Sequence, residues 1–511
     1  MVLIANESEP AMPRQWRLWR PGRADVVALL FVVLATLGAS ALVVRAERHF
    51  GPIDEFQHFD YVTELVYHHR VPLPGDVFTQ EAMRTFVCHS APAGPNAPRC
   101  SDTTFNPADF QTGGRVTAGG EAPAYYVPTA VVAWLAAKVT GAKDLFYATR
   151  LASVLWLLLG TVVVYLLARS FAAGRLLASA IALGSALGPL MLYQGSTTNP
   201  DSMSLLAGAG TAAAWLRWRG STSRRSWIAM AALLTFVAMI KPNFIVVPVA
   251  VALAELVIVA TGGRRALLNR RTWAMRMPLM RMWTAAAVAV GASVLWSIWF
   301  RYVAVPPSAL TPPGARYGAQ HWNTGVALIG WGKSLYPQTD LPPLLHKGEF
   351  MFLSAVVDAL FIAGVLAAAV LARRRMPAED RVSSGLAPSI DPLRALGVLA
   401  VVSLVIAAPM VYAIVAASGA FIVYPPRYSM FIVPLGLVAL GTLAVPETAV
   451  RRFLAAQVSL DTAAGARLEP SRQDAEVLAP PQVGQPSDAA ANRRSEEGPD
   501  VDAAREHPLM S

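Results

Sequence analysis

The stretch from Gly51 to Tyr61 gathers side chains that could do acid–base chemistry. It reads Gly-Pro-Ile-Asp-Glu-Phe-Gln-His-Phe-Asp-Tyr, and Asp54, Glu55 and His58 stand close together in it. On a helix, Asp54 and His58 would be four residues apart and share one face. An ionised carboxylate within hydrogen-bond reach of a substrate hydroxyl can act as a general base. The alternative is that Asp54 is simply a helix N-cap.

This acidic stretch follows an apolar run, Ala24 to Val44, that has the length of a membrane-spanning helix. The 511-residue chain is 54% hydrophobic and only 15% charged. Soluble domains carry about 25% charged residues, so we expect a polytopic membrane protein. The expected fold class is all-α, with about ten or eleven transmembrane helices. Asp54 and Glu55 would then lie at the boundary between lipid and water.

The chain is basic, with 43 Lys and Arg against 33 Asp and Glu, but its charge pattern does not indicate nucleic-acid binding. The arginines cluster in short loops between apolar runs, which is the positive-inside pattern of membrane proteins. We therefore expect the lipid bilayer, and no nucleic acid, as a partner. Arginines also precede the first apolar run without a small-residue cleavage site after it, which predicts an uncleaved anchor.

We expect three regions along the chain. Residues 1–23 would be a basic cytoplasmic N-terminus, residues 24–446 a transmembrane domain, and residues 447–511 a disordered cytoplasmic tail. The composition of the tail cannot bury a core. Long external loops are expected at about 45–145 and 304–349.

The arginine-rich loops also predict a topology. They all fall on the cytoplasmic side, with Asp54 outside, only if the apolar run at 123–137 dips into the membrane without crossing it. We therefore favour ten crossings plus one juxtamembrane or re-entrant helix, with both termini inside. Eleven crossings is the alternative.

Further polar side chains would return to the same external face, namely Arg150, Asn199, Asp201, Lys241, Arg427 and Tyr428. Lys241 is one of five lysines in the chain. A lysine at membrane depth is costly unless it is paired or snorkels to the interface. Cations on this face need anionic partners. These could be lipid headgroups or the phosphate of a lipid-linked substrate, which arginine binds well.

The only two cysteines, Cys88 and Cys100, fall in the first expected external loop. Eleven residues between them can close a ring, and pairing requires an oxidising compartment. We expect a disulfide, with two free thiols as the alternative.

Taken in order, these motifs resemble the GT-C superfamily of membrane glycosyltransferases. The resemblance rests on Asp54-Glu55 with His58, a Pro-x-Tyr-Tyr element that contains Pro123, Tyr125 and Tyr126, Arg150, the Asn199-Pro200-Asp201 turn, Lys241, and Arg427-Tyr428. The chain looks most like the domain-of-unknown-function 2142 family of predicted membrane proteins, over roughly residues 24–446. That family usually has Pro-Pro at the Tyr-Tyr element, where this chain has a single proline.

The resemblance implies an inverting sugar transfer on the external face of a bacterial plasma membrane. The donor would be a polyprenyl-phosphate-linked sugar, and the acceptor a glycan, lipid or protein of the cell envelope. Asp54 would be the general base. Glu55, the second catalytic candidate, would position the acceptor with His58.

The other motif residues would bind substrate. The expected substrate-binding set is His58, Tyr125, Tyr126, Arg150, Asn199, Asp201, Lys241, Arg427 and Tyr428. Within it, the cations Arg150, Lys241 and Arg427 would hold the leaving phosphate. A divalent cation, Mg²⁺ or Mn²⁺, is a further expectation, with Asp54, Glu55, His58 and Asp201 as its ligands. Some relatives need no metal.

Two other function classes stay open. A transporter or flippase for a lipid-linked or anionic precursor would use the same cations without a base. A non-catalytic envelope assembly protein would leave the acidic motif unused. Transporters usually show paired halves with broken helices, and we detect no matching halves. The sequence does not specify the sugar, the acceptor, the carrier length or the oligomeric state.

Overall fold

The computed structural model describes residues 22–262, apart from 53, 74, 91–97, 143 and 222, and residues 273–303, 329, 332–337, 348–373, 392–417 and 426–445. The chain divides into two units, and every described residue belongs to the first, Met1–Ser459. The expected tail at 447–511, most of the N-terminus at 1–23 and most of the loop at 304–349 lie outside the described residues.

Within these ranges the chain is helical and forms no strand, although Val77 and Arg115 make one isolated bridge. The α-helices are α1 (Arg23–Ala46), α2 (Glu55–Thr63), α3 (Gln80–Cys88), α4 (Tyr126–Thr140), α5 (Phe146–Ser170), α6 (Arg175–Ala186), α7 (Pro189–Ser196), α8 (Thr211–Ser221), α9 (Arg224–Ala238), α10 (Val246–Gly262), α12 (Trp273–Val303), α15 (Gly348–Arg373), α17 (Pro392–Ala417) and α18 (Val433–Leu443). Short 3₁₀ and π segments are η1 (Glu64–His68), η2 (Pro107–Asp109), η3 (Gln111–Gly114), η4 (Ala118–Gly120), η5 (Pro200–Met203), η6 (Leu206–Gly210), η7 (Pro242–Ile245) and η9 (Pro426–Ile432).

Six of the described helices are long and apolar enough to cross a membrane, and α6 with α7, bent by 67°, makes a seventh if the pair is one span. The all-α, multi-pass membrane architecture expected from composition is therefore confirmed. Some of the apolar segments that were expected to cross the membrane form helices that are shorter or interrupted. Helix α9 has 15 residues and α18 has 11, while the segment before α8 breaks into η5 and η6.

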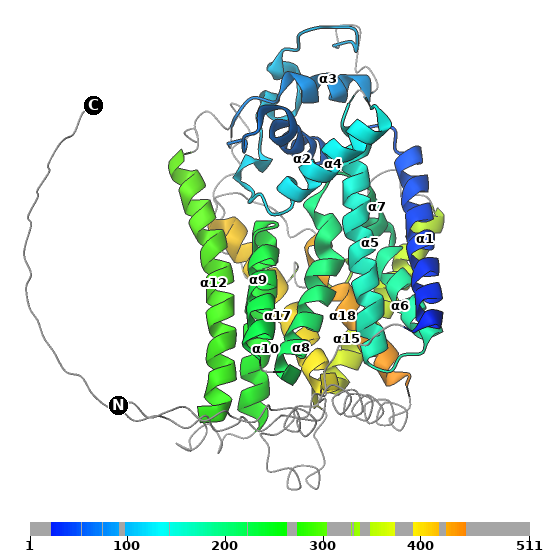
Figure 1. Ribbon diagram of the computed structural model, residues 1–511, viewed down its shortest axis with the longest axis vertical. Helices are drawn as coiled ribbons and strands as arrows, with labels where there is room; N and C mark the ends of the chain where they lie inside the picture. Colours follow the sequence, from blue (N-terminus) through cyan, green and yellow to red (C-terminus); the bar gives the residue numbers. More distant parts are fainter. Residues whose placement is uncertain are drawn as a thin grey trace, which may run out of the picture. The chain divides into compact units, whose positions relative to one another are not determined.

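The apolar run that was expected to dip without crossing forms α4. This helix has 15 residues. At 1.5 Å per residue it is about 22 Å long, shorter than the roughly 30 Å hydrocarbon core of a bilayer. It packs on α2 and α5, and Figure 1 draws it with α2 and α3 near one end of the long helices. Its length favours the ten-crossing topology, and which face each end meets stays a prediction.

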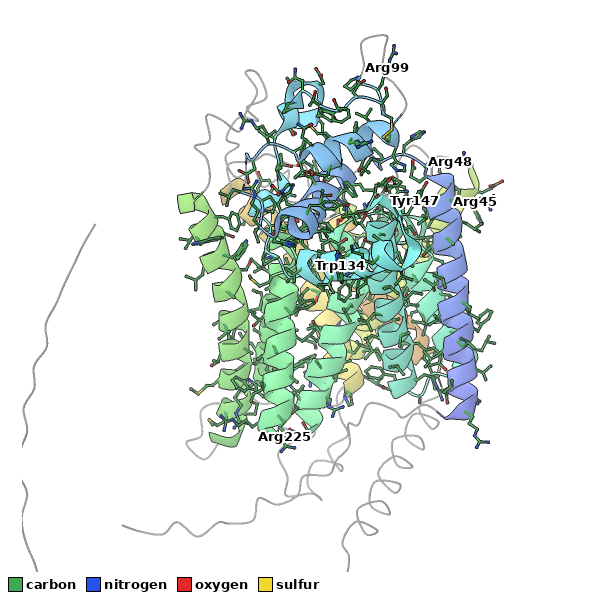
Figure 2. All side chains as sticks on the ribbon, turned by 45° about the horizontal axis from the view of Figure 1, so that its top comes forward. Arg45, Arg48, Arg99, Trp134, Tyr147 and Arg225 are labelled. Carbon is green, nitrogen blue, oxygen red and sulfur yellow. A yellow bond between two sulfur atoms is a disulfide. The ribbon has the colours of Figure 1, made fainter. Side chains whose placement is uncertain are left out.

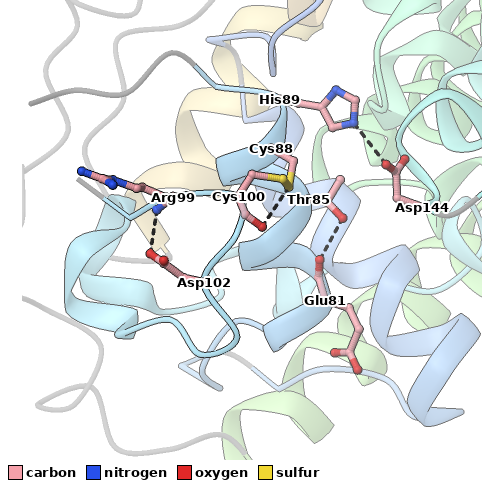
Figure 3. Close-up of a disulfide and its surroundings, with 8 residues drawn as sticks. All are labelled: Glu81, Thr85, Cys88, His89, Arg99, Cys100, Asp102 and Asp144. Carbon is pink, nitrogen blue, oxygen red and sulfur yellow. Dashed lines mark hydrogen bonds and ion pairs between the residues drawn. A yellow bond between two sulfur atoms is a disulfide. The ribbon is translucent and has the colours of Figure 1, made fainter. Parts of the chain in front are cut away.

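The segment around α2 and α3 is anchored by its own aromatic cluster. Phe56 and Phe59 of α2, a helix whose residues are all buried, pack with Phe78, Phe110 and Phe146, the last of which opens α5. A Cys88–Cys100 disulfide, confirmed here, ties the end of α3 to the following loop (Figure 3).

A second link between this segment and α5 comes from His89, which follows α3. Its Nε2 lies 3.2 Å from an Asp144 carboxylate oxygen just before α5 (Figure 3). The segment that carries the acidic motif is therefore fixed to the first residues of α5.

Buried ion pairs hold the other end of the bundle. Asp25 at the start of α1 accepts from Tyr165 and Arg169 at the end of α5, at 3.1 and 3.0 Å. Figure 2 places Arg225, at the start of α9, at the end of the bundle opposite Arg45 of α1 and Tyr147 of α5. The helix bundle thus has two distinct polar ends, and the acidic motif lies at the end where Arg45 and Tyr147 are found.

Candidate functional site

Four charged side chains that are far apart in the sequence meet at one place. Arg427 Nη2 lies 3.2 Å from Asp54 Oδ2, and Arg427 Nε lies 3.7 Å from Asp201 Oδ2. Lys241 Nζ lies 3.6 Å from the same Asp201 oxygen. We call Asp54, Asp201, Lys241 and Arg427 the ion cluster. All four were predicted to belong to one site, and the structure brings them together.

Tyr428 completes this group through its ring. The Lys241 ammonium and the Arg427 guanidinium each lie 5.5 Å from the ring centroid, within the range of a cation–π interaction. Attraction of both cations to one ring offsets part of the repulsion between their like charges. Tyr428 therefore supports the positive half of the ion cluster.

Asp54 occupies the N-cap position of α2 but does not cap it. Its side chain makes no capping hydrogen bond, and its backbone is left-handed, with φ 56° and ψ 6°. This conformation is unfavourable for a residue other than glycine, although aspartate tolerates it better than most. The side chain is 58% exposed and turns to Arg427 instead. The geometry therefore favours a site residue over the simple cap considered from the sequence.

The turn that carries Asp201 is built locally. Asn199 Oδ1 accepts a hydrogen bond from the Asp201 backbone N–H at 2.9 Å and so caps η5, where Pro200 has no N–H to satisfy. Asn199 is thus a capping residue in this structure. The expectation that it contacts substrate stays a prediction.

A close approach of η9 to η6 brings Arg427 to Asp201. A Cβ on Gly208 would lie only 1.9 Å from the carbonyl oxygen of Phe431. A side chain at Gly208 would therefore push η9 away. Glycine at this position lets η6 and η9, which are far apart in the sequence, pack closely together.

Glu55 and Arg150 form a buried ion pair with each other. Arg150 Nε donates to Glu55 Oε1 at 2.8 Å, and its Nη2 donates to Oε2 at 2.7 Å. The guanidinium also donates to the carbonyls of Glu47 and His49, which follow α1. Both side chains are buried. In this structure all of these contacts of Arg150 are to the protein itself, and the expectation that it holds a leaving phosphate stays a prediction.

The remaining capacity of the Glu55 carboxylate is taken by backbone. Thr198 N donates to Oε1 at 2.9 Å and Gly51 N donates to Oε2 at 2.6 Å. A carboxylate that accepts four hydrogen bonds inside the protein has no lone pair directed at a substrate. Glu55 is thus a structural neighbour of Asp54, and the expected catalytic and metal-binding roles do not fit its contacts.

The two tyrosines of the Pro-x-Tyr-Tyr element separate into different surroundings. The Tyr125 hydroxyl lies 2.8 Å from Ser153 Oγ of α5, inside the bundle. The Tyr126 oxygen lies 2.7 Å from His58 Nδ1, and its hydroxyl donates to Glu121 Oε2. Tyr125 is therefore a helix-packing residue here, whereas Tyr126 belongs to the neighbourhood of the ion cluster.

Glu121 is a site residue that the sequence motifs did not identify. Burial raises the pKa of its carboxyl to about 7, Lys241 opposes this rise, and Asp201 and Asp54 add to it. These influences place Glu121 within electrostatic reach of the ion cluster. The signal in the sequence was an acidic residue two positions before Pro123, at the edge of an apolar run.

The expected metal ligands are not assembled. Among the residues that the structure describes, no three His, Cys, Asp or Glu side chains form a group that could hold a metal ion. Glu55 is taken by Arg150, and His58 Nδ1 is taken by Tyr126. Binding of Mg²⁺ or Mn²⁺ stays a prediction.

No protein-family model matches the chain, and no curated protein matches it in sequence. Among solved structures, the chain is similar to ArnT from Cupriavidus metallidurans, determined with undecaprenyl phosphate bound. The match covers 81% of this chain and 77% of that one, with 13% identity and a TM-score of 0.34. At this level of similarity, the chemistry has to be inferred from the side chains of this chain.

Proposed function

We propose that this protein is a membrane glycosyltransferase of the GT-C type. It would transfer a sugar from a polyprenyl-phosphate-linked donor to an acceptor hydroxyl, with Asp54 as the general base. The observation that carries the proposal is the exposed Asp54 carboxylate beside Arg427, in a cluster whose second cation is the buried Lys241. One face thus offers a proton acceptor and two cations, which are the groups that this transfer needs.

Asp54 supplies the base. Its side chain is the most exposed of the four in the ion cluster, so an acceptor hydroxyl can approach it. Asp54 takes the hydroxyl proton as the acceptor oxygen bonds to the anomeric carbon of the donor. The bond from that carbon to the phosphate oxygen breaks, and attack from the opposite face inverts the anomeric configuration.

Lys241 and Arg427 supply the anion site for the leaving polyprenyl phosphate. Negative charge grows on the bridging phosphate oxygen as its bond to the sugar breaks, and fixed cations stabilise it. The 3.6 Å between Lys241 and Asp201 exceeds the length of a charge-assisted hydrogen bond. The ammonium is therefore held near Asp201 without a close hydrogen bond to it, which leaves it able to turn to a phosphate.

We propose the class of donor, the class of acceptor and the membrane face on the same chemistry. A lipid-linked donor fits a site at the end of membrane-spanning helices. An envelope glycan, lipid or protein acceptor, and a site on the external face, follow from the expected topology. Membership of the domain-of-unknown-function 2142 family belongs to the proposal too, on the motif resemblance alone.

The test is a transfer assay with the purified full-length protein in lipid. A panel of polyprenyl-phosphate sugars is supplied with candidate acceptors, and free polyprenyl phosphate is measured. The expected result is release that depends on an acceptor and is lost in Asp54→Asn. Movement of intact lipid-linked sugar across the bilayer, without release from any donor, would support a flippase instead and overturn the proposal.

A further inference from the structure

The hydroxyl of Tyr126 joins His58 to Glu121. The Tyr126 oxygen lies 2.7 Å from His58 Nδ1, and its hydroxyl donates to Glu121 Oε2. His58 and Tyr126 are buried, and the Glu121 side chain is 16% exposed. The Tyr61 ring stacks on Tyr126 with centroids 3.7 Å apart, and its hydroxyl donates to the Glu121 backbone carbonyl. The three groups form one hydrogen-bonded chain whose tyrosine is held in place.

The donor and acceptor order of these hydrogen bonds decides what His58 can bind. The Tyr126 hydroxyl has one proton, which is directed at Glu121, so its oxygen is left to accept from His58 Nδ1–H. Burial lowers the pKa of His58 well below its usual range, and the charges of Lys241 and Arg427 lower it further, so the ring is neutral. A neutral imidazole with its proton on Nδ1 has a bare lone pair on Nε2.

That lone pair is buried and is not used within the described part of the chain. His58 Nε2 has no hydrogen-bond partner among the described residues. A buried acceptor without a partner costs free energy, which a ligand that donates a hydrogen bond would recover. A hydroxyl can donate this bond, whereas the ionised oxygens of a phosphate can only accept. The chemistry of Nε2 therefore fits the sugar part of a substrate and not its phosphate.

We propose that Glu121, acting through Tyr126, is a positioning residue that holds His58 in the tautomer whose Nε2 accepts a hydrogen bond from a carbohydrate hydroxyl. The inference rests on the proposed glycosyl transfer, which supplies hydroxyl-bearing donor and acceptor sugars. No proton is transferred at Nε2, because Asp54 takes the proton of the reacting hydroxyl. His58 orients a second, non-reacting hydroxyl.

The surroundings of Glu121 are compatible with this role. Lys241 lies within its electrostatic reach and favours the ionised carboxylate, while Asp201 and Asp54 disfavour it. His58 Nδ1 lies 3.7 Å from Glu121 Oε2, too far for a direct hydrogen bond. The tyrosine is therefore needed as the link, and the tautomer is best measured well above pH 7, where the carboxylate is ionised.

Nitrogen NMR of protein labelled at histidine reads the tautomer directly. Because the chain has eight histidines, the His58 signals are assigned by their loss in His58→Gln. Well above pH 7, wild-type His58 should carry its proton on Nδ1. Glu121→Leu removes the acceptor of the tyrosine proton, so Tyr126 should donate to Nδ1 and the ring proton should move to Nε2.

Two further variants separate this role from a merely structural one. Glu121→Gln keeps an oxygen that can accept from Tyr126, so it should restore the Nδ1–H tautomer. Tyr125→Phe changes the neighbouring buried tyrosine, which contacts Ser153 and not His58, and should leave the tautomer as it is. A wild-type His58 protonated on Nε2 would overturn the proposal. This readout needs no turnover, so it stands even if the transfer reaction is not found.

Kinetics identify the sugar that supplies the hydroxyl. With a donor and an acceptor that support turnover, Glu121→Leu should raise KM about tenfold for the sugar bound at Nε2, with a smaller change in kcat. A rise for the acceptor alone assigns the hydroxyl to the acceptor, and a rise for the donor alone assigns it to the donor. An unchanged KM for both, in a variant whose tautomer has moved, would overturn the binding of a hydroxyl at Nε2.

Discussion

Arg150 holds Glu55 through two parallel hydrogen bonds, at 2.8 and 2.7 Å, across 95 positions of sequence. The pair is adjacent to Asp54, since Glu55 is the next residue in the sequence. The Glu55 carboxylate also accepts from Gly51 N, which closes the turn that leads to Asp54. The strained backbone of Asp54 is therefore held by its neighbour, and the direction of its carboxylate depends on a residue that does not contact the ion cluster.

Replacing Arg150 by lysine should lower the rate of sugar transfer without weakening donor binding. A lysine ammonium cannot form the forked contact to Glu55 or reach the carbonyls of Glu47 and His49 together with it. The turn before α2 would loosen and Asp54 would sample other directions, so we expect kcat to fall about 10- to 100-fold. Donor binding, measured by retention of labelled lipid, should change little because Arg150 does not face the cluster.

Arg169→Lys is the matched control for this variant. Arg169 is also on α5, is buried, and pairs with an acid, Asp25, at 3.0 Å at the other end of the helix. Its loss should destabilise the bundle to a similar extent while the kcat of the folded protein is retained. Equal losses of kcat in both variants would mean that the Glu55–Arg150 pair acts only through general stability.

The buried carboxyl of Asp60 should make the stability of the protein depend on pH. The buried Asp60 carboxylate accepts from the backbone N–H and the hydroxyl of Thr79, which caps α3, both at 2.9 Å. Burial nevertheless raises its pKa from 3.8 to about 7. The folded protein then holds a proton that the unfolded chain releases between those values, so the contribution of Asp60 to stability should be full below about pH 4 and be lost as pH rises to about 7.

Asp60→Asn tests this sign. Asparagine keeps an oxygen for both Thr79 contacts and cannot ionise, so the part of the pH dependence due to Asp60 should vanish. Above pH 7 the variant should be more stable than wild type, by an amount on the order of a few kcal/mol. Thermal unfolding in detergent across this pH range measures the effect. Asp109→Asn removes an exposed carboxylate of the same segment and controls for net charge; a variant of Asp60 that is no more stable than wild type above pH 7 contradicts the account.

The Cys88–Cys100 bridge can be checked in protein isolated from membranes. Trypsin cleaves after Arg99, between the two cysteines, so their peptides stay joined only through the disulfide. Mass spectrometry without reductant should show the joined pair, and reduction should separate it. A ring of this size stabilises by about 3 kcal/mol at most, so the double Cys→Ala variant should keep its transfer activity. Labelling of both thiols in the intact protein would exclude the bridge.

Much of the ion cluster could be predicted because sequence reports which end of a helix a residue occupies. Asp54, Asp201, Lys241 and Arg427 each stand at the end of an apolar run, and counting the runs places them at one end. The same reasoning did not show which groups Arg150 contacts. It stands at that end too, but the direction of its side chain is set by Glu55 and by the carbonyls of Glu47 and His49, which are distant in sequence.

Side-chain direction explains the other differences. Tyr125 and Tyr126 are adjacent, and consecutive helical residues point about 100° apart, so one faces α5 and the other faces His58. Composition alone did not distinguish them. Nor did it show where apolar runs break, because η5 and η6 depend on Pro200 and on the packing around Gly208 and not on hydrophobicity.

Arg427→Ala should weaken both donor binding and rate. Arg427 contacts both carboxylates of the ion cluster and shares the ring of Tyr428 with Lys241. Loss of one phosphate contact should lower retention of labelled donor about tenfold or more, because charge-assisted bonds to phosphate are among the stronger ones. Arg427→Lys should recover part of the binding. If donor retention stays at the wild-type level in Arg427→Ala, the phosphate site lies elsewhere.

The Asp54→Asn variant distinguishes most clearly between Asp54 as a general base and Asp54 as a helix cap. Asparagine keeps the size of the side chain and an oxygen that can still accept from Arg427, but it cannot take a proton. Turnover should therefore fall about 10²- to 10⁴-fold, the usual contribution of general-base catalysis, while donor retention stays near wild type. Asparagine caps helices as well as aspartate, so a residue that only capped α2 would give an almost silent variant. Turnover of Asp54→Asn is measured against wild type at equal amounts of folded protein. Near-wild-type turnover would remove Asp54 as the base. Because the contacts of Glu55 are all internal, the search for the base would then move to Asp201 and Glu121.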